Sequence, residues 1–270
     1  MKIPIVGCIV VALFLSACEP RQSASNSDLH GPGKWVDLSH DFATDTIYWP
    51  TAEPFKLETV AAGKTEAGYY YSAYQFCAAE HGGTHIDAPV HFSEGNKPVD
   101  QLPLDHLIGP VIKLDVSAKA NSDRDYQVSS ADFQDWEGQN GRIPDGSIVL
   151  IQTGWSAYWN DRAKYLGTDK RGTEGVAELH FPGLAPDAAR WLTENRKINA
   201  IGLDTASIDY GQSKLFESHR TLMARDIPAF ENVANLEQLP TRIRLVVALP
   251  MKIRGGSGGP LRIVARLDVP

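Results

Sequence analysis

Residues 80–92 read EHGGTHIDAPVHF, and this stretch holds three of the chain's eight histidines within eleven residues, with an aspartate between the last two. From His85 onward, polar and apolar residues alternate with a period of two. That period is typical of a strand whose polar face carries His85 and Asp87 and whose other face joins the core. Two glycines separate His81 from His85, and each would cost about 1 kcal/mol inside a helix. The pattern predicts a tight loop followed by a strand.

The same stretch supplies imidazole and carboxylate, the usual ligands of zinc, manganese or iron. His85 and Asp87 lie about 7 Å apart along a strand, so their side chains can converge, and we assign them with His81 as metal ligands. His91 would start about 20 Å from His85 on the same polar face, and we expect Pro89 to bend it back. Its unperturbed pKa near 6.5 suits a catalytic proton carrier. Chance clustering of surface or core histidines is the alternative.

The rest of the chain predicts strands and helices in alternation. Stretches rich in valine and isoleucine predict strands at 110–116, 147–154, 198–204, 244–253 and 261–267. Helices are predicted to begin at Ser130 and at Pro186. This order indicates a mixed α/β fold with several buried strands. Because no linker follows residue 34, we expect a single domain over 35–270.

The first residues have a different composition. Lys2 precedes an apolar run too short for a membrane span, so residues 1–17 predict an export signal. The stretch LSAC resembles the bacterial lipoprotein box, in which Cys18 would be lipidated, and an ordinary signal peptide cleaved nearby is the alternative. Residues 18–34 predict a flexible tether. With Glu19 following the cysteine, the resemblance implies the periplasmic face of the outer membrane.

The charge and the cysteine content of the chain limit its possible partners and its disulfide bonds. The net charge of −7 and pI near 5.6 argue against nucleic acid as a partner, because phosphate binding needs clustered Lys and Arg. Of three cysteines, Cys8 lies in the signal and Cys18 would carry lipid, which leaves Cys77 without a disulfide partner. We expect Cys77 to be buried among aromatic neighbours.

Residues 81–91 match every fixed position of H-x-G-T-H-x-D-x-P-x-H. This pattern resembles the signature of the cyclase family of metal-dependent hydrolases, which includes bacterial kynurenine formamidase and isatin hydrolase. Flanking stretches extend the resemblance from Trp35 to the C-terminus, including VDLSH at 36–40 and GLDTASID at 202–209. The resemblance implies a single mixed α/β domain with a central or barrel-like β-sheet. It also implies a small-molecule amide substrate and a homodimer or larger homo-oligomer.

The resemblance implies a second set of ligands, a histidine and a glutamate twelve residues further on. His219 and Glu231 stand at that separation. His81, His85 and Asp87 would then hold one ion, while Asp87, His219 and Glu231 would hold a second. The cofactor expected is zinc or manganese, with one or two ions per chain, since some relatives use a single ion. On the residues alone, His219 is equally an ordinary surface histidine.

Two further residues are candidate substrate contacts. Trp49, in the stretch YWP, would stack on an aromatic substrate or cover the core. Ser207 would orient substrate or belong to a turn after a strand. The stretch GGSGG at 255–259 matches the hydrolase elbow G-x-S-x-G, but a strand pattern and no histidine follow it. We interpret it as a connection between two strands.

These observations favour a lipid-anchored hydrolase that opens the amide bond of a small aromatic substrate. Removal of a formyl group from an aryl amine, as in kynurenine formamidase, is the leading form of this hypothesis. Isatin-type opening of a cyclic amide is the alternative within the same class. The residues are also compatible with a lipoprotein that binds a ligand at its metal site without catalysis, and with lyase or cyclisation chemistry on the same fold.

Overall fold

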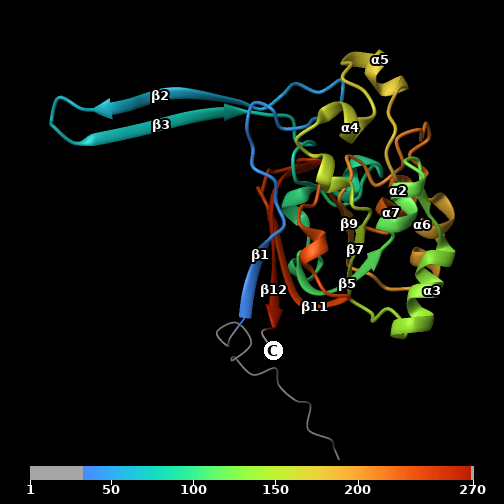
Figure 1. Ribbon diagram of the computed structural model, residues 1–270. Coiled ribbons are helices and arrows are strands. Elements are labelled where there is room, and N and C mark those ends of the chain that lie inside the picture. The colour runs from blue at the N-terminus through green and yellow to red at the C-terminus, as the bar shows by residue number, and fades with distance from the viewer. Residues whose placement is uncertain (1–32, 269–270) are drawn as a thin grey trace, which may run out of the picture. The chain divides into compact units, whose positions relative to one another are not determined.

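A closed β-barrel forms the centre of the protein, in a computed structural model that describes residues 33–268 (Figure 1). Neighbouring strands follow the order β12, β11, β5, β7, β9, β10 and β4, and β4 pairs again with β12. Their bounds are β4 His85–Asp87, β5 Ile108–Asp115, β7 Ile148–Gln152, β9 Ala200–Leu203, β10 Ala229–Glu231, β11 Arg242–Pro250 and β12 Gly258–Asp268. This mixed α/β fold with a seven-stranded mixed barrel confirms the predicted fold class.

The run β5, β7, β9 and β10 is parallel, whereas β4, β11 and β12 pair in antiparallel fashion. Closure satisfies the backbone groups that an open sheet would leave at its edges. The strand β1, Gly33–Asp37, pairs with the end of β12. It begins two residues before the predicted domain start at Trp35.

Both faces of the central strands are buried, which explains their continuous apolar sequence. In β7, Ile148 and Leu150 join one hydrophobic cluster, while Val149 and Ile151 join the other. The second cluster includes residues of α3 (Ser130–Asn140), α6 (Pro186–Asn195) and α7 (Glu217–Met223). Two of these helices begin at the predicted residues. Ser129 and Asp132 form a capping box for α3, and proline occupies the first turn of α6.

Shorter elements connect the larger ones. They are α2 Ser117–Ser122, β6 Gln127–Val128, α4 Arg162–Leu166, α5 Gly172–Ala177 and β8 Gly183–Leu184, with 3-10 turns at Pro89–His91, Val99–Gln101, Leu104–His106, Trp155–Tyr158 and Leu236–Gln238. Within residues 33–268, no helix combines the length and apolar character needed to cross a bilayer. The predicted signal at 1–17, Cys18 and all but the last two residues of the predicted tether lie outside the described residues.

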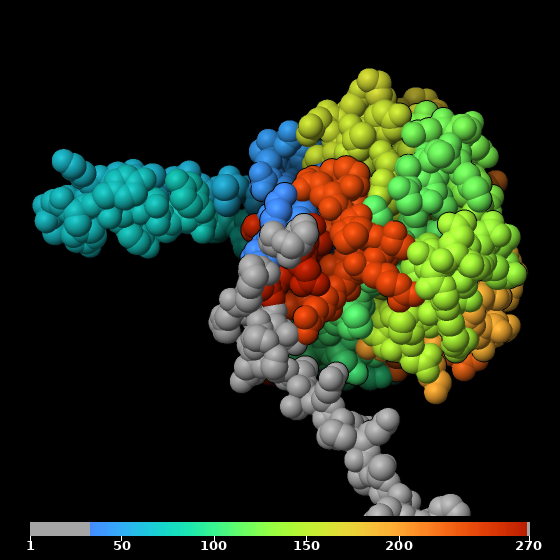
Figure 2. Space-filling model, turned by 60° about the horizontal axis from the view of Figure 1, so that its bottom comes forward, coloured from blue at the N-terminus to red at the C-terminus, as the bar shows by residue number. Residues whose placement is uncertain are grey.

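A long hairpin extends away from the barrel (Figures 1 and 2). It consists of β2, Lys56–Lys64, and β3, Tyr70–Cys77, paired with each other in antiparallel register. Seven large hydrophobic side chains on it are more than half exposed: Leu57, Val60, Tyr69, Tyr70, Tyr71, Tyr74 and Phe76. Cys77 ends β3 and is also exposed, so the expectation that it is buried is wrong. The aromatic residues near Cys77 lie on the exposed hairpin, so they do not cover the thiol.

Candidate metal centre

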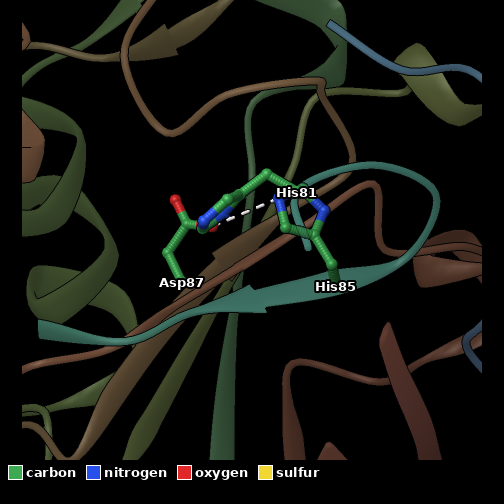
Figure 3. Close-up of side chains that lie close together, drawn as sticks. All are labelled: His81, His85 and Asp87. Carbon is green, nitrogen blue, oxygen red and sulfur yellow. Dashed lines mark hydrogen bonds and ion pairs between the residues drawn. The ribbon is translucent and has the colours of Figure 1, made fainter. Parts of the chain in front are cut away.

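The first predicted ligand group is assembled on β4 and the loop before it. His85 and Asp87 are two residues apart on this strand, so their side chains point to the same side. His85 Nε2 lies 3.2 Å from one Asp87 oxygen, and His81 Nδ1 lies 2.6 Å from the same oxygen. Figure 3 shows the three side chains turned toward one another beside the strand. Both predictions for this segment, the tight loop and the strand, agree with the structure.

Close packing explains the glycines between His81 and His85. A Cβ atom at Gly82 would overlap the ring of Tyr48, at 2.1 Å. Gly83 has a φ of +59°, in the left-handed region that favours glycine. Thr84, which follows, is fully buried and donates a hydrogen bond to the carbonyl oxygen of Asn232 at 2.7 Å. The loop is therefore held against the barrel from both sides.

The second ligand group comes from distant parts of the chain. Glu231 lies directly opposite His85 in the antiparallel pair of β10 and β4, so their side chains are neighbours. His219 reaches the same place from α7, with Nε2 at 3.1 Å from Asp87 and 3.1 Å from Glu231. The ligand atoms of Asp87, His219 and Glu231 lie within 4.8 Å of one another, as do those of His81, His85 and Asp87. Asp87 belongs to both groups.

Two residues outside these groups hold them in place. Asp209 accepts a 2.6 Å hydrogen bond from His219 Nδ1 and a 3.1 Å bond from the His219 backbone amide. Asn232 donates from its side chain to the carbonyl of Gly83 at 2.7 Å. In the sequence, Asp209 was only the last residue of the stretch GLDTASID at 202–209, and Asn232 had no signal. Both act by contacts between segments that are far apart in the chain.

The cluster concentrates charge in a buried place. Burial raises the pKa of Glu231, and the nearby Asp87 carboxylate raises it further. Burial opposes ionisation of Asp87 as well, but the charge of His81 and hydrogen bonds from His219 and His81 hold the Asp87 pKa well below its usual value. Burial alone would lower the pKa of His219, yet its bonds to Asp209, Asp87 and Glu231 raise it well above its usual value. Such a cluster needs positive charge among its carboxylates.

A divalent metal ion fits these residues. His85 Nε2 is buried and points at the cluster without a hydrogen-bond partner among the described residues, while its Nδ1 donates to the Gly83 carbonyl at 2.9 Å. A free imidazole nitrogen beside two carboxylates and two more histidines is the donor set of zinc and manganese sites. His219 and His85 would offer Nε2 to the ion, because Nδ1 is engaged elsewhere in both.

His91 lies beside the ligand groups. The extended path ends at Asp87, and residues Pro89–His91 form a 3-10 turn. The expectation that His91 shares a strand face with His85 is therefore wrong, but the expected bend at Pro89 brings it back. Its ring stacks on His81 with centroids 3.8 Å apart. Burial lowers the pKa of His91 to about 4, which keeps the ring neutral near neutral pH.

A cavity of about 320 Å³ opens onto the cluster. Its lining includes every predicted metal ligand, the predicted proton carrier and both candidate substrate contacts: His81, His85, Asp87, His219, Glu231, His91, Trp49 and Ser207. Tyr48, from the stretch YWP, also lines the cavity, and Phe92 and Phe216 add aromatic walls that the sequence did not indicate. Trp49 also contacts the core ring of Phe181 edge-on, with centroids 6.4 Å apart.

The chain resembles known proteins over most of its length. The model of the Cyclase family matches residues 36–210. An isatin hydrolase of Roseibium aggregatum is 30% identical over 238 residues, covering 85% of each chain. A kynurenine formamidase of Bacillus cereus is 30% identical over 233 residues, covering 86% of this chain and 97% of that protein.

The fold agrees with these relatives. The solved structure of isatin hydrolase A from Ralstonia solanacearum superposes with a TM-score of 0.79 at 30% identity, covering 90% of this chain and 95% of that one. The family match ends before His219 and Glu231, so the second ligand group rests on the geometry of the side chains. From the matched residues and the clustered ligands, the chain belongs to the Cyclase family of metal-dependent hydrolases.

Proposed function

We propose that this protein hydrolyses the carbon–nitrogen bond of a small aromatic amide with one or two divalent metal ions, zinc or manganese. The observation that carries this proposal is the meeting of two ligand groups, joined by Asp87, with an aromatic-walled cavity. Cavities of this size accommodate small molecules. The curated relatives supply a second line of support, because their names describe amide-cleaving hydrolases.

The metal ion, His91 and Asp209 would have different roles in this reaction. A bound divalent ion would supply polarisation of the substrate carbonyl and ease the deprotonation of water near neutral pH. His91, neutral and at the cavity, would accept the proton of the attacking water on a ring nitrogen and return it to the departing nitrogen. Asp209 would keep His219 in one orientation by accepting its Nδ1 proton.

The cavity walls favour a flat aromatic substrate. Tyr48, Trp49, Phe92 and Phe216 present ring surfaces, and Ser207 offers a hydroxyl group. Release of formate from an aryl formamide is the leading form of the reaction, and the complete second group with Glu231 supports a site for two ions. Ring opening of isatin is the second candidate, supported by the similarity to isatin hydrolases in sequence and structure.

Metal analysis coupled to a substrate panel tests this proposal. Purified protein is analysed for bound metal, and hydrolysis of N-formylkynurenine and of isatin is followed before chelation, after chelation, and after zinc or manganese is restored. We expect one or two ions per chain and turnover of one compound that chelation abolishes and metal restores. A metal-free protein would remove the central claim. Metal without turnover of any amide would favour a binding lipoprotein, or lyase or cyclisation chemistry.

We also propose that the protein is exported and anchored by a lipid at Cys18, at the periplasmic face of the outer membrane. The support is the residue pattern of the first eighteen positions alone. Metabolic labelling with a fatty acid in a Gram-negative host tests it. Label should enter the natural chain and be absent from a Cys18→Ser variant.

The hairpin supports a homo-oligomer. A two-stranded hairpin is marginally stable by itself in water, and this one exposes seven large hydrophobic side chains. If two copies exchange their hairpins, the aromatic rings would bury on the order of 1,000 Å², enough for a specific interface. We therefore propose a second copy of this chain as the partner. Because β3 ends four residues before His81, the same contact would brace the first ligand group.

A further inference from the structure

We propose that Ser257 and Glu80 form a positioning pair that fixes the ring of His81, so that its Nδ1 faces the ligand cluster. This inference rests on the proposed metal site. Each of the three ligand histidines has one nitrogen at the cluster and one turned outward. For His85 and His219, the outward nitrogen is Nδ1, held by the Gly83 carbonyl and by Asp209. His81 has the opposite arrangement, with Nδ1 inward and Nε2 outward.

The outward nitrogen of His81 meets the hydroxyl of Ser257. The distance from His81 Nε2 to Ser257 Oγ is 2.9 Å, and Ser257 Oγ lies 2.6 Å from a carboxylate oxygen of Glu80. The Ser257 backbone amide donates to the same oxygen at 3.0 Å. The three side chains thus form a short chain of hydrogen bonds that leads away from the cluster.

The direction of these bonds follows from what each group can donate. A carboxylate only accepts, so the single hydroxyl proton of Ser257 is donated to Glu80. The oxygen of Ser257 must then accept from His81, which places the imidazole proton on Nε2. His81 Nδ1 lies 2.6 Å from a carboxylate oxygen of Asp87, which only accepts, so Nδ1 donates a proton there. A bound metal ion would replace that proton and leave Nε2–H as the outer donor. The pair would therefore select the Nε2–H tautomer of the metal-bound ring as well as its orientation.

The glycines on either side of Ser257 leave room for this contact. A Cβ atom at Gly256 would lie 2.6 Å from a Glu80 oxygen, and one at Gly258 would lie 2.6 Å from His81 Cε1. Side chains at either place would push the serine away from its two partners. The Ser257 carbonyl also accepts from the backbone amide of Ala88 at 2.8 Å, which fixes the loop beside β4.

This geometry gives the stretch GGSGG a role different from that of a hydrolase elbow. It lies between β11 and the first residues of β12, as predicted for a connection between strands. Ser257 does not line the cavity, and its hydroxyl is engaged by Glu80 and His81. The serine acts through His81 and is a positioning residue.

His81 is the ligand that most needs such support. Its side chain is 25% exposed, against 3% for His85 and 3% for His219. It also stands on a loop, whereas His85 stands on a strand and His219 on a helix. A ring that can turn toward solvent presents the wrong nitrogen part of the time. Outer partners of this kind typically change metal affinity about 10- to 100-fold.

The test compares the metal affinity of full-length variants by competition with a chromophoric chelator, using zinc alone and manganese alone. We expect Ser257→Ala to weaken binding about 10- to 100-fold. Ser257→Thr, which keeps the hydroxyl, should restore affinity to within about threefold of the natural chain, and Glu80→Ala should resemble Ser257→Ala. Ser39→Ala is the matched control, because the Ser39 hydroxyl also bonds to β12 but lies away from His81.

Two further readouts separate positioning from general stability. The melting temperature of the metal-free protein should be the same for Ser257→Ala and the Ser39→Ala control. In the zinc-loaded protein with ¹⁵N-labelled histidine, a slowly exchanging Nε2 proton of His81 should be present and should be lost in Ser257→Ala. Unchanged affinity in Ser257→Ala would overturn the inference, as would an affinity loss that Ser257→Thr does not repair.

The outcome is distinguishable from failure of the proposed function. If the natural chain binds metal but hydrolyses no amide, the affinity comparison still decides the role of Ser257. If the natural chain binds neither ion, the metal site and this inference are both overturned.

Discussion

The two ligand groups share Asp87 but are built in different ways. The first comes from seven consecutive residues, 81–87, and its His81 is partly exposed. The second joins Asp87 to His219, 132 positions away, and all its members are buried. The first depends on the shape of one loop, and the second on the closure of the barrel. Residues close together in the chain thus form the partly exposed side of the site, while residues far apart in the chain form its buried side.

The largest effect is expected where the two groups meet. Asp87→Asn keeps the side chain's shape but removes the charge shared by both groups. Turnover should fall at least about 1,000-fold, because the polarising ion is lost. Metal content measured by elemental analysis should fall below one ion per chain. Asp37→Asn, at an exposed ion pair with Arg262, is the control. Full metal content in Asp87→Asn would contradict the shared role.

His91 tests whether the site is catalytic or only binds. It lies beside the first group without belonging to either. His91→Ala should lower kcat about 100-fold or more, since proton transfer is removed, while metal content stays constant. The measurement is steady-state kinetics on the amide that proves to be a substrate, with metal analysis of the same sample. Equal loss of metal and turnover would instead make His91 a ligand.

Glu231 tests whether the second group holds its own ion. Glu231→Gln keeps the hydrogen-bonding shape opposite His85 but removes a carboxylate. We expect about tenfold lower turnover and weaker binding of the second of two ions, seen as a lost step in a metal titration. A titration with the same number of steps in both proteins would assign one ion to the whole cluster.

The hairpin is connected through the chain to the first ligand group and not to the second. Loss of the contact between two hairpins should therefore affect the first group only. Replacement of Tyr70, Tyr71 and Tyr74 by serine should lower the mass in sedimentation to that of a monomer. We expect only a few-fold loss of kcat/KM. Matched changes at the exposed Leu104 and Leu215 should leave the mass unchanged. A monomeric natural chain that binds lipid vesicles through these tyrosines would assign the arm to a membrane.

The smallest effect at neutral pH is expected at His40, which contacts Thr84 in the loop of the first group. The His40 amide donates to Thr84, and its ring stacks on Trp159 with centroids 4.0 Å apart. Burial lowers the pKa of His40 to about 4. In the unfolded chain the His40 pKa is near 6.5, so between pH 6.5 and pH 4 the unfolded chain binds more protons than the folded one. The contribution of His40 to the free energy of unfolding is therefore fully present above pH 6.5 and is lost as the pH drops toward 4.

His40→Phe keeps the ring stack without a titrating group. Between pH 7.5 and pH 5, the natural chain should lose about 2 kcal/mol more of its unfolding free energy than the variant. Urea unfolding at the two pH values measures the difference. Parallel losses in both proteins would place the acid sensitivity elsewhere.

The sequence by itself determined the parts of the site that depend on neighbouring residues. The alternation after His85 indicated the strand, and the glycines indicated the loop, because backbone geometry over a few residues follows from those residues. Continuous apolar runs located five of the seven barrel strands, β5, β7, β9, β11 and β12, whereas β10 was not predicted, and Ser130 and Pro186 marked two helices. The spacing of His219 and Glu231 acquired a meaning only through the family resemblance.

The tertiary structure decided what depends on long-range register. Only the pairing of β4 with β10 places Glu231 opposite His85, and only the return of β12 to β4 brings Ser257 to His81. The exposure of Cys77 on the hairpin belongs to the same class. In each case, the partner lies far away in the chain, so its position is set by barrel closure and packing, which no local pattern records.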